Sequence, residues 1–165
     1  MKTLIKHITT TSFILASGFT FAQSTAQTHS VVQLSSSTAL SLAVAGVKEC
    51  AKDNYNVTTT VVDLTGRVLA QLRNDDATTH TLESSRKKAF TAVSMKQPTA
   101  NLMTLIQDKP MLAPLQNMDD NLLFLAGGIP LKINDQIVGG IGIGGAPGGH
   151  LDVACAQAAI NSVLK

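Results

Sequence analysis

The sequence predicts an α+β domain in which helices cover an antiparallel sheet, and two observations carry that prediction. The first is the order of the predicted elements: a helix, two strands, two helices, three strands and a last helix. The second is that the strands fall into two hairpin blocks, without the alternation of strand and helix that indicates a parallel sheet. With 44% apolar and 15% charged residues, the composition is that of a folded domain.

The N-terminus differs from the rest of the chain. Two lysines and an apolar run over residues 8–21 precede a small-x-small motif that ends at Ala22. We interpret residues 1–22 as a secretory signal peptide and residues 23–37, rich in Ser, Thr and Gln, as a flexible lead-in. The expected location is periplasmic or secreted, with a single domain over residues 38–165.

The charge of the mature chain excludes one class of partner. Without the signal peptide, 11 basic residues face 11 acidic ones, and aromatic residues make up only 4% of the full chain. Nucleic-acid binding needs a basic surface, which this balance does not predict. No membrane span is expected after signal removal, because the apolar run is short and interrupted.

The two cysteines allow two interpretations. Cys50 and Cys155 each lie in a predicted amphipathic helix, and an oxidising compartment would permit a disulfide between them. A buried free thiol is equally ordinary in such a helix. The sequence does not give the Cα separation that a bridge requires, so both interpretations stay open.

The first half of the domain is predicted to hold a helix and a hairpin. Apolar residues at helical spacing indicate a helix over Thr38–Asp53. β-Branched residues indicate a strand over Val57–Leu64, and a turn at Gly66 leads to a second arm over Val68–Arg73.

Two helices and a connector follow. The pattern from His80 predicts a helix that ends before Pro98, and a second, short helix is expected over Thr99–Gln107. Prolines make residues 108–117 an irregular connector.

The last part completes the sheet. Asn121–Leu125 is expected to form a short strand, and Ile129–Ile133 should pair with Gln136–Gly144 as a second hairpin. Gly148–Leu164 closes the chain as a helix. This gives five strands.

The strand Gln136–Gly144 is predicted to have two unlike faces. Because side chains alternate along a strand, one face carries three isoleucines and the other carries glycines: Ile137, Ile141 and Ile143 against Val138, Gly140, Gly142 and Gly144. A row of interior glycines indicates that something approaches the backbone closely. A helix of the same fold, a neighbouring subunit and a flat ligand are all candidates.

The same glycines formally match a dinucleotide-binding pattern, Gly140-x-Gly142-x-x-Gly145. That motif requires a βαβ unit and an acidic residue about 20 positions further on. Only 20 residues remain after Gly145, and they are predicted to be helical. The nucleotide interpretation is therefore rejected.

Catalytic patterns are scarce, so a binding protein is favoured over an enzyme. No serine lies in a Gly-x-Ser-x-Gly elbow, and no Cys-x-x-Cys or His-x-x-x-His spacing indicates zinc. The carboxylate pairs Asp75-Asp76 and Asp119-Asp120 lie in predicted loops, where solvated turn residues are the simpler interpretation. No catalytic residue is predicted.

A different chemistry is suggested by the central helix. His80, Ser84 and Lys87 are spaced to lie on one side of it, although the basic run Arg86-Lys87-Lys88 is most simply a solvated face. An imidazole and a cation beside a glycine-bare strand would suit a planar anionic macrocycle. The imidazole would meet the iron of haem, and the cation would pair with a propionate.

Several motifs in the same order resemble the GlcG/HbpS-like haem-binding family, over about residues 38–165. They are Val62-Asp63-Leu64-Thr65-Gly66-Arg67, the stretch His80 to Ala92 with Pro98-Thr99, Gly127-Gly128-Ile129-Pro130-Leu131, and Val138 to Gly149 with Asp152 and Cys155-Ala156. The resemblance implies a profilin-like α/β/α three-layer domain with a five-stranded antiparallel sheet. It also implies homo-oligomers, often octamers, and haem as the cofactor.

The resemblance also implies a site. It places His80, Arg86 and Lys87 at the polar positions of the family's central helix. We expect His80 to be the axial ligand of haem iron, Arg86 or Lys87 to pair with propionates, and Gly140 and Gly142 to line the site. His150 departs from the family, whose members commonly have an acidic residue there; it is a surface change or a second imidazole.

The expected function is that of a secreted or periplasmic haem-binding protein that acts in haem sensing, uptake or degradation. The alternative is a small-molecule-binding protein or enzyme of the same fold that does not use haem. In a third interpretation the protein is a structural oligomer, and the glycines only let helices or subunits approach.

Overall fold

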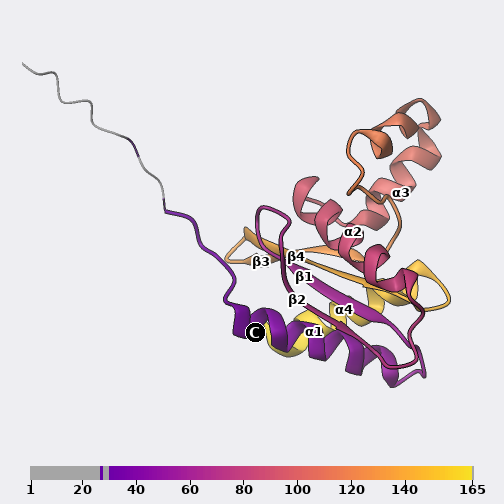
Figure 1. Ribbon diagram of the computed structural model, residues 1–165. Coiled ribbons are helices and arrows are strands. Elements are labelled where there is room, and N and C mark those ends of the chain that lie inside the picture. The colour runs from indigo at the N-terminus through magenta and orange to yellow at the C-terminus, as the bar shows by residue number, and fades with distance from the viewer. Residues whose placement is uncertain (1–26, 28–29, 165) are drawn as a thin grey trace, which may run out of the picture. The chain divides into compact units, whose positions relative to one another are not determined.

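The structure is a computed structural model that describes residues 27 and 30–164 (Figure 1). The predicted signal peptide, residues 1–22, lies outside the described residues. The chain divides into two units, residues 1–30 and 31–165. Every helix and strand of the described residues belongs to the second unit.

The second unit contains four α-helices, one 3₁₀ helix and four strands within the described residues. In chain order these are α1 (Ser36–Ala51), β1 (Thr58–Val62), β2 (Val68–Arg73), α2 (His80–Ser94), α3 (Thr99–Asp108), η1 (Pro110–Asn117), β3 (Gly128–Ile133), β4 (Gln136–Gly144) and α4 (Gly149–Val163). The bounds of β2 and β4 are the predicted ones, and the other predicted helices and hairpin strands are present with small shifts.

The elements form three layers. The strands make one antiparallel sheet in the order β2-β1-β4-β3. Helix α2 covers one face, and α1 and α4 lie side by side on the other (Figure 1). Helix α3 and η1 continue from α2 and extend beyond the sheet (Figure 1). The predicted α+β class and α/β/α layering are confirmed.

Within the part of the chain that the structure describes, the sheet has four strands, so the prediction of five is wrong. The segment expected to be the extra strand, Asn121–Leu125, runs as a loop instead. Its Leu123 amide donates a hydrogen bond to the Thr91 hydroxyl of α2 (2.8 Å) rather than to a neighbouring strand. Leu122 and Phe124 are buried in a small cluster with Leu102 of α3. The apolar residues of this segment therefore serve helix packing.

The main core lies between the sheet and the pair α1–α4. Its members are aliphatic or small: Leu34, Ala39, Leu42, Ala43, Cys50, Val57, Val61, Leu131, Val138, Ile141, Ile143, Cys155, Ala156 and Ala159. Cys50 and Cys155 form a disulfide that joins α1 to α4, with Cα atoms 5.3 Å apart. The structure thus selects the disulfide from the two interpretations left open.

A β-bulge changes which residues of β4 share a face. Leu131 pairs with Gly139 but Lys132 pairs with Ile137, so Val138 is the extra residue. Val138 consequently joins the α1–α4 core, while Ile137 packs with the cluster beneath α2. Strict alternation predicted Ile137 on the α1–α4 side and Val138 on the α2 side. That prediction is wrong, because the bulge exchanges the faces of these two residues.

Candidate functional site

Helix α2 carries the predicted ligand, His80, as its first residue. The side chain is exposed, and it does not line any of the five cavities described for this part of the chain. Two helical turns further along, Lys87 lies on the same side of the helix, because seven residues make almost two full turns. An exposed imidazole and a half-buried lysine therefore lie on one side of the helix.

Arg86 points elsewhere. Its guanidinium donates to the Glu83 carboxylate through Nε and Nη2 (3.1 and 2.9 Å) and to Asn121 Oδ1 through Nη1 (3.0 Å). Hydrogen bonding from Arg86 lowers the pKa of Glu83. Arg86 thus links α2 to the loop before β3. Because its guanidinium is engaged in these hydrogen bonds, Lys87 is the better candidate to pair with a propionate.

Gly140 and Gly142 lie directly beneath α2. A Cβ at Gly140 would come within 2.6 Å of the Ala89 carbonyl oxygen, and one at Gly142 would collide with the Ser85 carbonyl. Of the three candidates for close approach, a helix of the same fold fills this face. Because that helix leaves no space above them, the haem site proposed below does not include these glycines.

Lys88, the third member of the basic run, is buried rather than solvated. Its ammonium donates to Asp152 Oδ2 (2.7 Å) and to the Ile143 carbonyl (2.9 Å), and both side chains of the pair are 3% exposed. The ion pair joins α2 to the start of α4 across the end of β4. The signal was present in the helical spacing, since Lys88 falls on the same face as the buried Ser85 and Ala92.

Asp152 completes this buried pair. Its other carboxylate oxygen accepts a hydrogen bond from the Ala146 amide (3.1 Å). Burial raises the pKa of Asp152, and the Lys88 ammonium and the Ala146 amide oppose part of that rise. The pair is shielded from solvent, so we assign it to positioning helices rather than to ligand binding.

Hydroxyl contacts hold α2 on the sheet. Thr58 and Thr81 share a hydrogen bond between their hydroxyls (2.7 Å), and Thr60 and Ser85 form the same contact at 2.7 Å. The Gln71 amide donates to Thr60 Oγ1 (2.8 Å) and to the Leu82 carbonyl (2.9 Å). These bonds satisfy buried polar groups and fix the helix that presents His80.

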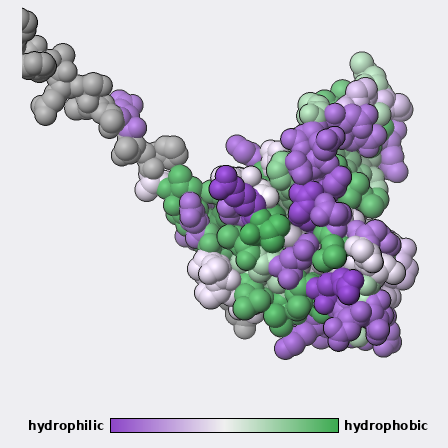
Figure 2. Space-filling model, viewed as in Figure 1, coloured by the Kyte–Doolittle hydropathy of each residue, from purple (hydrophilic) through white to green (hydrophobic). Residues whose placement is uncertain are grey.

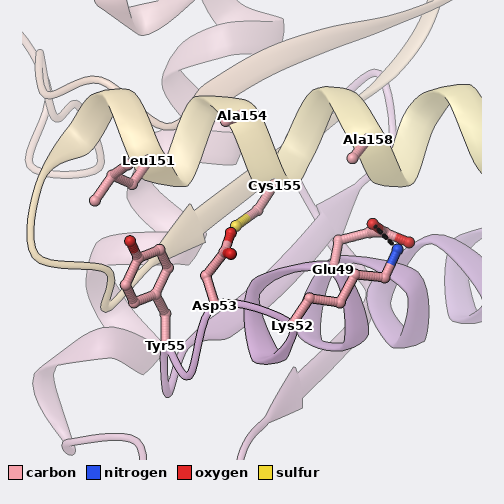
Figure 3. A pocket seen from close by; sticks show the side chains of 8 residues that line it. All are labelled: Glu49, Lys52, Asp53, Tyr55, Leu151, Ala154, Cys155 and Ala158. Atoms are coloured by element: carbon pink, nitrogen blue, oxygen red, sulfur yellow. Dashed lines mark hydrogen bonds and ion pairs between the residues drawn. The ribbon is translucent and has the colours of Figure 1, made fainter.

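The cavity beside the disulfide has a charged lining. It has a volume of about 290 Å³ and is lined by Glu49, Lys52, Asp53, Tyr55, Leu151, Ala154, Cys155 and Ala158. In Figure 3, Lys52 and Glu49 form an ion pair beside it, and Tyr55 and Asp53 come from the turn after α1. Its lining offers neither an imidazole nor a thioether to haem iron.

A second cavity lies between α3 and α4 and is mostly apolar. It has a volume of about 300 Å³, and His150 is part of its lining. Within the described residues, no group of three His, Cys, Asp or Glu side chains is placed to hold a metal ion. None of the helices described in the structure is long and apolar enough to cross a membrane.

Comparison with known proteins places the chain in a family. The family model of the haem-degrading, HbpS-like proteins matches residues 34–161. The chain belongs to the HbpS-like family. It is 32% identical to protein GlcG of Escherichia coli K12 over 115 residues. The matched region covers 68% of this chain and 81% of GlcG. It spans 66% of the length of an uncharacterised 15.0 kDa protein of Citrobacter freundii.

Solved structures of HbpS-like proteins have the same fold. A double mutant of Streptomyces reticuli HbpS superimposes with a TM-score of 0.78 at 35% identity, over 91% of this chain and 99% of HbpS. The complex of PduOC with haem superimposes with a TM-score of 0.71 at 29% identity, over 81% of this chain and 96% of PduOC. The resemblance seen in the motifs is confirmed.

Proposed function

We propose that this protein binds haem. The observation that carries the proposal is the family match over residues 34–161, joined to a structural neighbour that was solved with haem bound. Two side chains of α2 fit such a ligand, because the exposed imidazole of His80 can bind haem iron and the ammonium group of half-buried Lys87 can pair with a propionate.

The first candidate site lies on the exposed side of α2. In this proposal His80 is the axial ligand of the iron, and Lys87, on the same side of the helix, pairs with a propionate. Arg86 is the second cation near the site, although its guanidinium already serves Glu83 and Asn121. Bound haem would supply redox and oxygen chemistry; the protein residues named here hold and orient it.

A haemin titration tests the proposal. The full chain should give a sharp Soret band that saturates at a stoichiometric amount of haemin, and His80→Ala should weaken binding by about tenfold or more. Tenfold is a lower bound because even partners that only support a ligand are worth 10–100-fold. The matched control is Thr79→Ala, one residue away. A broad absorbance change that never saturates would contradict haem binding.

Three roles for the bound haem follow from the proposal: sensing, uptake and degradation. Degradation is separable by experiment. A haem-degrading protein should bleach its Soret band when a reductant and oxygen are supplied, whereas a sensor or carrier should retain the band through repeated reduction and reoxidation.

The Cys50–Cys155 disulfide supports a periplasmic or secreted location, because disulfides persist in oxidising compartments and are rare in the cytosol. The predicted signal peptide agrees with this proposal. Residues 1–22 fused to alkaline phosphatase should export the reporter in active form. An inactive cytosolic reporter would contradict the proposed location.

An exposed apolar surface supports a homo-oligomer, for which the family resemblance implies an octamer. Leu40 on the outer side of α1 is 57% exposed and lines a cavity with Val44 and Ala45. Figure 2 shows apolar residues gathered over the N-terminal half of α1. Such patches on soluble proteins commonly mark interfaces. Light scattering should show an assembly that Leu40→Glu dissociates, while Gln107→Glu, exposed on α3, serves as the control.

A further inference from the structure

The cavity between α3 and α4 differs from the other four described cavities because its lining includes an imidazole. Its lining comes from α3, from the loop before β3 and from the start of α4: Ala100, Met103, Thr104, Leu125, Ala126, Gly149, His150 and Val153. These lining residues, all within the described chain, include no carboxylate, lysine or arginine. An imidazole and a thioether are the strongest metal-binding groups among them.

Small residues create this space. A Cβ at Gly149 would lie 2.9 Å from both the Cβ and the carbonyl oxygen of Ala126, so a larger residue would force α4 away from the loop. Ala100 and Ala126 leave the room that bulkier side chains would fill. The volume of about 300 Å³ is at the lower end of the range for ligand pockets.

The imidazole of His150 lies at the start of α4, against Gly148. A Cβ at Gly148 would come within 2.7 Å of Cε1 and 2.9 Å of Nδ1 of the ring. A side chain at position 148 would therefore displace the imidazole of His150 from this position. The side chain is exposed as well as part of the cavity lining, so a ligand can reach it from solvent.

We propose that His150 binds haem iron at this cavity, as an axial ligand separate from His80. The inference rests on the proposed haem-binding function and adds a site to it. Apolar walls with one imidazole are the surroundings that a porphyrin edge and its iron require. Because the cavity is small, it receives one edge of the macrocycle, and the propionates stay in solvent.

The alternative origin of His150, a neutral surface change, makes a different prediction. If His150 is only a surface change, neither filling the cavity nor removing the imidazole should affect haem binding. The proposal requires that filling the cavity and removing the imidazole have the same effect on haem. Ala100→Phe fills the space from α3 and leaves the imidazole of His150 in the chain.

The experiment is a haemin titration of the full chain followed by visible absorption, with His80→Ala, His150→Ala and Ala100→Phe run in parallel. We expect His150→Ala and Ala100→Phe each to weaken binding by about tenfold or more or to remove one equivalent of haem. Added imidazole should restore the Soret band of His150→Ala, because free imidazole can occupy the position of the missing ring, but should not restore that of Ala100→Phe. Ala158→Phe, in the cavity beside the disulfide, is the filled-cavity control.

The outcomes separate this inference from the function on which it rests. No saturable Soret band in the unaltered protein would overturn both. Binding that His80→Ala removes and His150→Ala leaves intact would uphold haem binding and overturn the His150 site. Should Ala100→Phe lose its folded circular dichroism spectrum, imidazole rescue of His150→Ala decides the question: no rescue overturns the site.

Discussion

On the α1–α4 side of the sheet, aliphatic side chains of mixed size and a disulfide fill the interface, whereas on the α2 side glycines, hydroxyls and one buried ion pair do so. The first interface is non-directional and can adjust to small changes in volume. The second depends on close backbone approach and on matched hydrogen bonds. The first proposed haem site lies on the less tolerant side, since α2 carries His80 and Lys87.

The largest expected effect tests the close approach of α2. In Gly142→Val the new side chain would collide with the Ser85 carbonyl and lie 2.5 Å from the Ala89 amide, neither of which can move without shifting the helix. We expect destabilisation by more than about 4 kcal/mol, which is the exceptional range for one substitution. Urea unfolding followed by circular dichroism measures it. Gln136→Val, at the exposed start of the same strand, should change stability by less than about 0.5 kcal/mol.

The next effect concerns the buried ion pair. Lys88→Met leaves the Asp152 carboxylate buried without its cation, which should cost about 3–5 kcal/mol near neutral pH. Lys87→Met, on the solvent side, is the control. Equal unfolding midpoints for the two variants would show that Lys88 is not buried as described.

The same variant has a pH dependence whose sign is fixed. Burial already raises the pKa of Asp152, and loss of Lys88 removes an opposing influence, so the folded-state pKa rises further above the unfolded value. The native state then binds the extra proton more readily than the unfolded state, and stability is lost as pH rises through the folded pKa. The deficit of Lys88→Met relative to the unaltered protein should shrink as the pH falls through the raised folded-state pKa toward the ordinary pKa of an Asp carboxyl, about 3.9. A deficit that grows on acidification would contradict this account.

On the opposite side of the sheet, the disulfide should contribute less than the ion pair. Replacing both Cys50 and Cys155 by serine removes a link between residues 105 positions apart, at an expected cost of about 2–4 kcal/mol. Reducing the unaltered protein with dithiothreitol should lower the urea midpoint by a similar amount. An unchanged midpoint in both experiments would mean that the aliphatic core alone holds α1 to α4.

The smallest expected effect is on the surface of α2. Arg86→Ala loses the exposed contact with Glu83 and the hydrogen bond to Asn121, worth together about 1 kcal/mol or less. Haem affinity should change less than in Lys87→Ala, because Arg86 is already engaged. The opposite ranking in a haemin titration would make Arg86 the principal propionate partner.

The sequence predicted the hairpins well because their alternation and turn residues are local. It did not predict the bulge at Val138, which depends on the pairing partner in β3 and exchanges the faces of Ile137 and Val138. The loop found in place of the predicted fifth strand also depends on contacts with distant residues, because its apolar side chains pack on α3. A run of apolar residues predicts that the segment is buried, but it does not predict which element packs against it.

The candidate site shows the same limit. The glycines of β4 correctly indicated close approach, but only the structure shows that α2 is what approaches. Lys88 was grouped with its charged neighbours, although its helical position beside Ser85 already favoured burial. Its partner, Asp152, lies 64 positions away in sequence. The cavity at His150 needs three separate segments to form, so no local pattern could reveal it.

The most direct test of haem binding is the stoichiometry of the complex after separation from free ligand. The full chain, incubated with excess haemin and passed through a desalting column, should retain a fixed whole-number ratio of haem to protein, read from the haemochrome spectrum. A retained ratio that drops in His80→Ala or His150→Ala would identify the ligand. Loss of all haem on the column, or a ratio that grows without limit as more haemin is added, would contradict the account.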